Sequence, residues 1–173
     1  NEIDWEGRKD AWLERINKLF GDIEQWLNFL IDNRLLEISK TQFDLNEQYI
    51  GSYSVPKIEM LASTDRISLS PVATLIVGSY GRIDMNGPKG RKLMLVLSDT
   101  DRPSTTRIRV SVRGEVIEDS HPGEENDNDI QLSSAKIIRD RCKWYFVEPS
   151  ERTRKTLVTK ESFEGILMGM LQP

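Results

Sequence analysis

Cysteine and histidine are almost absent from this sequence. Its 173 residues include one cysteine, Cys142, and one histidine, His121. A lone cysteine cannot form a disulfide within the chain, which is typical of proteins kept in a reducing compartment, so we expect a cytoplasmic protein. Zinc sites need several cysteine or histidine ligands, so these residues predict no metal site, and we expect no cofactor. Because Cys142 precedes an apolar segment, we interpret it as a small buried residue rather than a nucleophile.

The sequence also lacks an apolar run of the roughly 20 residues that a membrane span needs. Residues 1–5 lack the basic and apolar segments of a signal peptide, so we expect no membrane association. The net charge of −4 argues against binding nucleic acid with the whole surface. The charge is unevenly spread, however, because acidic residues predominate in 1–65 and basic residues in 79–113 and 136–160.

A helical pattern begins at Asp4, a suitable N-cap, and we assign the helical segment to residues 4–38. Apolar residues recur there at three- and four-residue spacing, at Trp5, Trp12, Ile16, Leu19, Ile23, Trp26, Leu27 and Leu30. Three tryptophans on one helix are compatible with partner binding or membrane binding. Aromatic stripes at this spacing usually form core, so we expect the tryptophans to cover a sheet.

The sequence predicts strands throughout a β-rich segment, 43–147, and a short helix over 159–171 headed by Thr159. The expected strands are 55–62, 66–70, the two arms of a hairpin within 73–99, 107–113 and, as the last strand, 143–147. We interpret the basic stretch after Pro149 as a connection. The predicted fold is a single α+β domain over 1–173, with an antiparallel sheet of about six or seven strands, a long N-terminal amphipathic helix and a short C-terminal helix. A partial barrel is the alternative form of the sheet.

The first arm of the hairpin within 73–99 contains glycines, which are unfavourable inside a strand. Gly78 and Gly81 lie in its first arm, where glycine indicates a bulge or a close approach by another backbone or a ligand. A phosphate-binding loop would require a following helix, and a two-metal site would require two close carboxylates, of which Asp84 supplies one. An enzyme with an unrecognised site near Gly78–Asp84 is therefore our third hypothesis.

Arginines at alternate strand positions are the clearest candidate binding feature. With Ile108, Val110 and Val112 pointing to the core, the exposed face carries Arg107, Arg109 and Arg113, and we expect Arg82, Arg91 and Lys92 to join them. Such a face can bind phosphates or an acidic protein surface. The alternative is an exposed sheet face kept soluble by charge. The acidic segment 118–129 can neutralise these arginines, and it lacks the ligand order of a calcium-binding loop.

These observations favour a non-enzymatic protein-interaction or regulatory module of a larger cytoplasmic assembly, bacterial in style, with a protein as its partner. The alternative is a nucleic-acid or phosphate-binding domain that uses the basic strand face. The two differ in one measurable respect, because binding to phosphates weakens steeply as salt rises.

Overall fold

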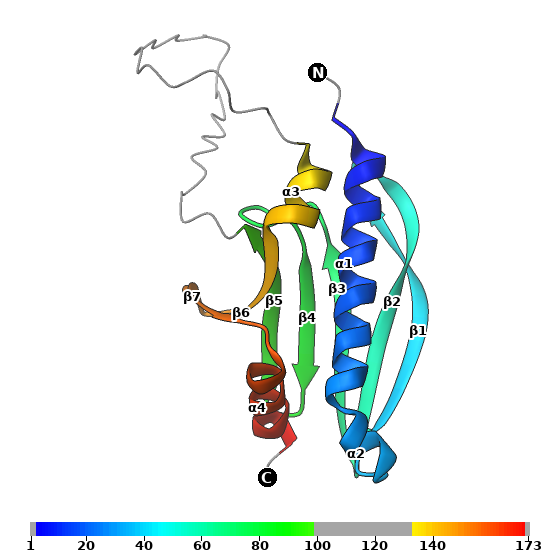
Figure 1. Ribbon diagram of the computed structural model, residues 1–173, viewed down its shortest axis with the longest axis vertical. Helices are drawn as coiled ribbons and strands as arrows, with labels where there is room; N and C mark the ends of the chain where they lie inside the picture. The colour runs from blue at the N-terminus through cyan, green and yellow to red at the C-terminus, as the bar shows by residue number, and fades with distance from the viewer. Residues whose placement is uncertain (1–2, 99–132, 172–173) are drawn as a thin grey trace.

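The computed structural model describes residues 3–98 and 133–171 and has one antiparallel sheet of seven strands, with its helices packed on one face (Figure 1). Each strand pairs with the next along the chain, so the order is β1-β2-β3-β4-β5-β6-β7 and the sheet is not closed. The strands are β1 (Glu37–Glu47), β2 (Gly51–Ala62), β3 (Asp65–Ala73), β4 (Arg82–Gly87), β5 (Gly90–Ser98), β6 (Cys142–Glu148) and β7 (Glu151–Leu157). The helices are α1 (Trp5–Trp26), α2 (Asn28–Asp32), α3 (Ser134–Arg141) and α4 (Lys160–Leu171). The α+β class is confirmed.

The long helix α1 forms as its spacing predicts. The Asp4 carboxylate accepts a hydrogen bond from the Gly7 amide at 2.8 Å and so caps the first turn. The helical segment ends earlier than residue 38, because α2 stops at Asp32 and Arg34 adopts a left-handed conformation with φ 58°. The chain then enters β1 at Glu37, six residues before the start of the β-rich segment that the sequence predicts.

The apolar face of α1 fills the side of the sheet on which all the main helices lie. Its Trp12 ring packs 5.8 Å from Trp144 of β6, between centroids, which confirms that this tryptophan covers the sheet. Phe163 of α4 lies 6.3 Å from Phe146 and 5.9 Å from Trp26, so α4 joins the same core beside α1. Thr159 accepts a hydrogen bond from the Ser162 amide at 3.2 Å and heads α4 as predicted.

Strand β2 changes the face that it buries halfway along its length. Tyr53 and Val55 are buried, and so are Ile58 and Met60, although a regular strand would place these two pairs on opposite faces. The register with β1 continues without a break, so the cause is twist rather than a bulge. The first half of β2 pairs only with β1, and two-stranded ribbons twist more than wide sheets.

Two elements differ from the sequence prediction near the end of the chain. Residues 143–147 are not the last strand, because the basic stretch that follows them forms β7 and pairs with β6. The segment before β6 forms α3, which the sequence pattern did not indicate. Ser133 caps it by accepting a hydrogen bond from the Lys136 amide at 3.3 Å.

The hairpin predicted within 73–99 exists, but its first arm is shorter than expected. Strand β4 begins at Arg82, and Gly87 pairs with Gly90 across a two-residue turn. Residues 74–81 are irregular apart from a single bridge between Ile76 and Ser79. The close neighbour of Gly81 is a side chain, not the backbone or ligand that the sequence suggested, because a Cβ there would lie 2.2 Å from the Trp12 ring.

We predict opposite effects for two glycine-to-alanine substitutions. Gly81→Ala forces the new methyl group into the buried Trp12 ring, and overpacking of this kind costs about 1–3 kcal/mol. Gly21→Ala, in α1, meets nothing within 4 Å and gains about 1 kcal/mol because alanine favours the helix. Urea denaturation measures both changes. Equal effects of the two variants would show that Trp12 does not pack against Gly81.

Candidate functional site

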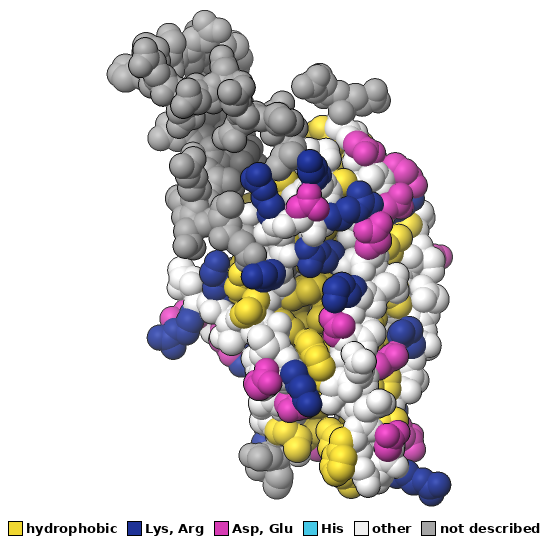
Figure 2. Space-filling model, in the orientation of Figure 1, with side chains coloured by type: hydrophobic (Ala, Val, Ile, Leu, Met, Phe, Trp, Pro, Cys, Tyr) yellow, Lys and Arg dark blue, Asp and Glu magenta, His cyan; other side chains and the backbone are white. Residues whose placement is uncertain are grey.

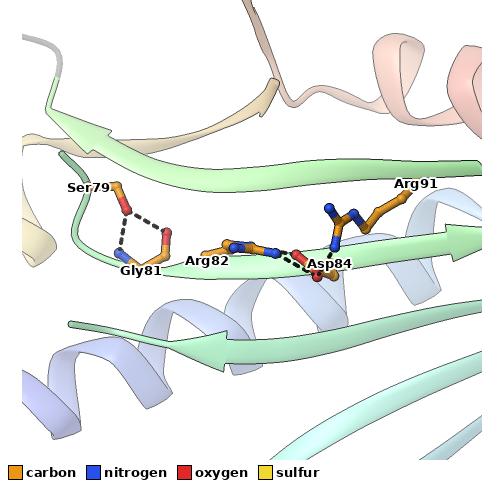
Figure 3. Close-up of polar contacts among 5 residues, drawn as sticks. All are labelled: Ser79, Gly81, Arg82, Asp84 and Arg91. Carbon is orange, nitrogen blue, oxygen red and sulfur yellow. Dashed lines mark hydrogen bonds and ion pairs between the residues drawn. The ribbon is translucent and has the colours of Figure 1, made fainter. Parts of the chain in front are cut away.

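The basic residues Arg82 and Arg91 lie on the face of the sheet opposite the helices, on either side of Asp84 (Figure 3). They point that way because the alternate residues of β4, Ile83 and Met85, are buried in the core. Arg82 donates two hydrogen bonds to Asp84, from Nε to Oδ1 at 2.6 Å and from Nη2 to Oδ2 at 2.9 Å. Arg91 Nη1 approaches Asp84 Oδ2 at 3.4 Å.

Asp84 therefore neutralises much of the positive charge at this point. Its side chain is only 13% exposed, and the hydrogen bonds to it raise the pKa of Arg82 above its ordinary value. A two-pronged arginine–carboxylate pair is among the stronger polar contacts in proteins. Neither Arg82 nor Arg91 presents an unpaired guanidinium group to a phosphate.

Lys92 does not join the two arginines. It lies opposite Met85 in the register of β4 and β5, and thus on the helix-covered face. Its ammonium group forms an ion pair with Glu148 of β6. The remaining candidates, Arg107, Arg109 and Arg113, lie outside the described residues, as do His121 and the acidic segment 118–129. A basic strand face built on those three arginines stays a prediction.

The polar side chains of the Gly78–Asp84 segment form hydrogen bonds with nearby residues of the chain. Ser79 Oγ donates to the Gly81 carbonyl at 3.2 Å and accepts from the Gly81 amide at 3.3 Å (Figure 3). Asp84 forms ion pairs with Arg82 and Arg91. Within residues 3–98 and 133–171, no group of three or more histidine, cysteine or acidic side chains is arranged to hold a metal ion. Cys142 is buried at the start of β6, as predicted.

A buried polar cluster around Glu47 was not predicted. Glu47 is only 7% exposed. Its carboxylate accepts hydrogen bonds from the Thr74 amide at 3.0 and 3.1 Å, the Leu75 amide at 2.9 Å and the Tyr53 hydroxyl. Arg8 of α1 donates to the Thr74 carbonyl at 2.7 Å. The cluster thus ties α1 and the tip of the β1–β2 hairpin to the irregular segment 74–81.

Burial dominates the electrostatics of this cluster. It lowers the pKa of Arg8 despite the nearby carboxylate, and burial together with the hydrogen bond to Glu47 raises the pKa of Tyr53 far above its ordinary value. Each oxygen of the carboxylate already has donors, so the arrangement is a fixed structural contact. The sequence does indicate where Glu47 points. It follows Phe43 and Leu45 at alternate positions of β1, so the three side chains share one face of the strand.

An apolar groove between α2 and α4 is the second feature that the sequence did not reveal. The α2–α4 groove has a volume of about 240 Å³, and its walls include Trp26, Phe29 and Leu30 on one side and Leu167 and Met168 on the other. Phe29 is 72% exposed and Met168 is 46% exposed. Figure 2 shows hydrophobic side chains gathered over α2 and α4 at the lower end of the molecule.

Comparison with family models, curated proteins and solved structures gives no match to this chain. None of the helices in the described part of the chain is both long and apolar enough to cross a membrane.

We predict that Glu47→Gln lowers the free energy of unfolding by about 2–3 kcal/mol. The amide group that replaces one carboxylate oxygen is a donor facing donors, and a buried donor left unsatisfied costs about 1–3 kcal/mol. Glu59→Gln is the control, because the half-buried Glu59 makes longer ion pairs, 3.4 Å to Lys57 and 3.5 Å to Arg66, and pairs near the surface are worth less than about 1 kcal/mol. Urea denaturation compares the two. Equal, small effects would contradict a structural role for Glu47.

Proposed function

We propose that this chain is a non-enzymatic protein-interaction module that binds an amphipathic helix of a partner protein in the α2–α4 groove. The observation that carries the proposal is the exposure of Phe29 and Met168 on facing walls of one groove. Single exposed apolar residues are ordinary, but apolar residues gathered around a groove are typical of protein-binding surfaces.

The size and shape of the groove favour a protein over a small molecule. Its volume of about 240 Å³ is below the roughly 300–1,000 Å³ of small-molecule pockets, so it suits one or two anchoring side chains. Both walls are helical, and a third helix laid between two helices is a common mode of peptide recognition. Lys160 and Glu164, an ion pair 4.0 Å apart, place both signs of charge along the rim.

The short helix α2 supports this role because Phe29, unlike Leu30 and Ile31, does not pack against the hydrophobic core. None of the five residues of α2 is buried, and no side-chain hydrogen bond caps its first turn. Phe29 therefore contributes little to folding while it presents a large apolar surface to solvent. Aromatic residues of this kind supply much of the binding energy at protein interfaces.

The nucleic-acid alternative receives less support from the described residues. Arg82 and Arg91 share Asp84, and Lys92 faces the other side of the sheet. That hypothesis depends on Arg107, Arg109 and Arg113.

We predict that Phe29→Asp abolishes partner binding without unfolding the chain. Val77→Asp is the matched control, because Val77 is 91% exposed but lies outside the groove. Both variants should keep the wild-type unfolding free energy within about 0.5 kcal/mol, since surface substitutions seldom do more. Affinity capture from an extract of the cells that make this protein, treated with nuclease, should retain one partner with wild type and Val77→Asp and lose it with Phe29→Asp.

Titration of the purified partner makes the test quantitative. Loss of an aromatic anchor costs about 2 kcal/mol or more of binding free energy, so the dissociation constant should rise about 30-fold or more with Phe29→Asp. Equal capture by all three proteins would contradict the groove as the binding site. Loss of all bound material on nuclease treatment would instead favour the nucleic-acid hypothesis.

A further inference from the structure

Within residues 3–98 and 133–171, strand β1 forms a long open edge of the sheet. It forms eleven consecutive pairs with β2 without a register shift, and it stands at one end of the strand order (Figure 1). On its outer side, alternate residues direct their backbone N–H and C=O groups away from β2. Such a row of backbone groups is a template for pairing with another strand.

The edge has fewer of the devices that usually prevent such pairing than the other edge of the sheet has, and its one lysine, Lys40, is paired with Glu24. Natural edges are protected by proline, by bulges, by short length or by clustered charge. Strand β7, the other edge, has several of these, because it is seven residues long, breaks register beside Glu148 and exposes Arg154 and Lys155. Strand β1 has no proline or register shift, and its centre, Thr41 and Gln42, is uncharged.

A groove beside β1 has room for the side chains of an added strand. It lies between α1 and β1, has a volume of about 650 Å³ and includes Gly21, Gln25, Asn28 and Ile38 in its lining. A Cβ on Gly21 would meet nothing within 4 Å, so this wall is open. A strand paired with β1 would continue the curve of the sheet around α1 and point alternate side chains into this space.

The sequence of β1 is complementary to itself in antiparallel pairing about Gln42. In that register Lys40 lies opposite Asp44 of a second copy, and Asp44 lies opposite its Lys40, on one face of the joined strands. Thr41 lies opposite Phe43, a favourable pairing of a β-branched residue with an aromatic one. Lys40 Nζ, 3.0 Å from Glu24, has three hydrogens and can serve both carboxylates.

Other registers lose the Lys40–Asp44 pairs, since axes at Thr41 or Phe43 place uncharged residues opposite both side chains. A two-fold axis at Lys40 would place two lysines opposite each other, and an axis at Asp44 would do the same with two aspartates. The register centred on Gln42 avoids both conflicts. A two-fold axis that passes through Gln42 perpendicular to the sheet also places the α1 helices of both copies on the same face of the joined sheet.

We propose that two copies of this chain pair through their β1 strands, antiparallel about a two-fold axis at Gln42, so that the two sheets become one. This surface uses none of the residues that line the α2–α4 groove, so the dimer and the proposed function can succeed or fail separately.

Charge exchange tests the proposal with the full chain. Asp44→Lys places like charges opposite each other twice in the dimer, and Lys40→Asp does the same with the opposite sign. Each variant alone should raise the dimer dissociation constant about tenfold or more in sedimentation equilibrium, since the cross-strand pairs contribute about 0.2–1 kcal/mol each and become repulsive. Circular dichroism checks that both variants are folded.

The two variants mixed together should form a heterodimer with about wild-type affinity, because every lysine then faces an aspartate. A substitution that merely damaged the fold would not be rescued in this way. Gln42→Cys should also form an intermolecular disulfide on oxidation, because the opposed residues lie on the axis at a suitable distance. Lys89→Cys, in the exposed β4–β5 turn, is the control and should not do so.

A monomeric wild-type protein at all concentrations would overturn the proposal. So would a dimer that Asp44→Lys leaves unchanged, because that result would place the interface elsewhere.

Discussion

The packing of one face of α1 against an open sheet is the contact on which the rest of this structure depends. Seven strands follow one another without closing, so the concave side of the sheet has to be covered by something other than its own strands. Trp12, Phe20 and Ile23 of α1 are fully buried there. The approach is so close at Gly81 that no side chain fits between helix and strand. Helix α4 completes the cover through Phe163.

The irregular segment 74–81 is held at its start by side chains and at its end by backbone hydrogen bonds between Tyr80, Gly81 and Val96 of β5. Buried backbone amides need hydrogen-bond partners, and the Glu47 carboxylate supplies them to Thr74 and Leu75. Arg8 brings α1 to the same point through the Thr74 carbonyl. Glu47 thus links the tip of the β1–β2 hairpin to the connection before β4, and Arg8 links that connection to the long helix. The twist of the β1–β2 ribbon is what carries Glu47 to that position.

The sequence predicts those elements whose burial follows a single period. Helix α1 is predicted because its apolar residues recur at helical spacing, and β3 and the second half of β2 are predicted because theirs alternate. Strand β7 has no apolar alternation, since it forms by pairing with β6 at an exposed edge. Helix α3 has only Ala135 and Ile138 buried, too few to show a period. Contacts with the rest of the fold therefore determine the structure of β7 and of α3.

The candidate site was harder to predict for a related reason. The residues after Lys92 are apolar on both faces, so no alternation fixes the phase of β5, and the face of Lys92 could not be deduced. Arg82 and Asp84 share a face by simple alternation, and their pairing follows from the sequence. Phe29 lies off the periodic apolar face of the helical segment, so the sequence gives it no partner. Its exposure is set by where α4 ends up, which no local pattern contains.

The open sheet has two edge strands, β1 and β7, which differ in how well they are protected against pairing with another chain. We propose that β1 is the edge that pairs with a second copy. Amide hydrogen exchange, followed across a range of protein concentrations, tests this most directly because it reports on both edges in one sample. If β1 pairs with a second copy, its exchange slows as the protein concentration rises, while exchange in β7 stays constant. Exchange in β1 that is independent of concentration would contradict it.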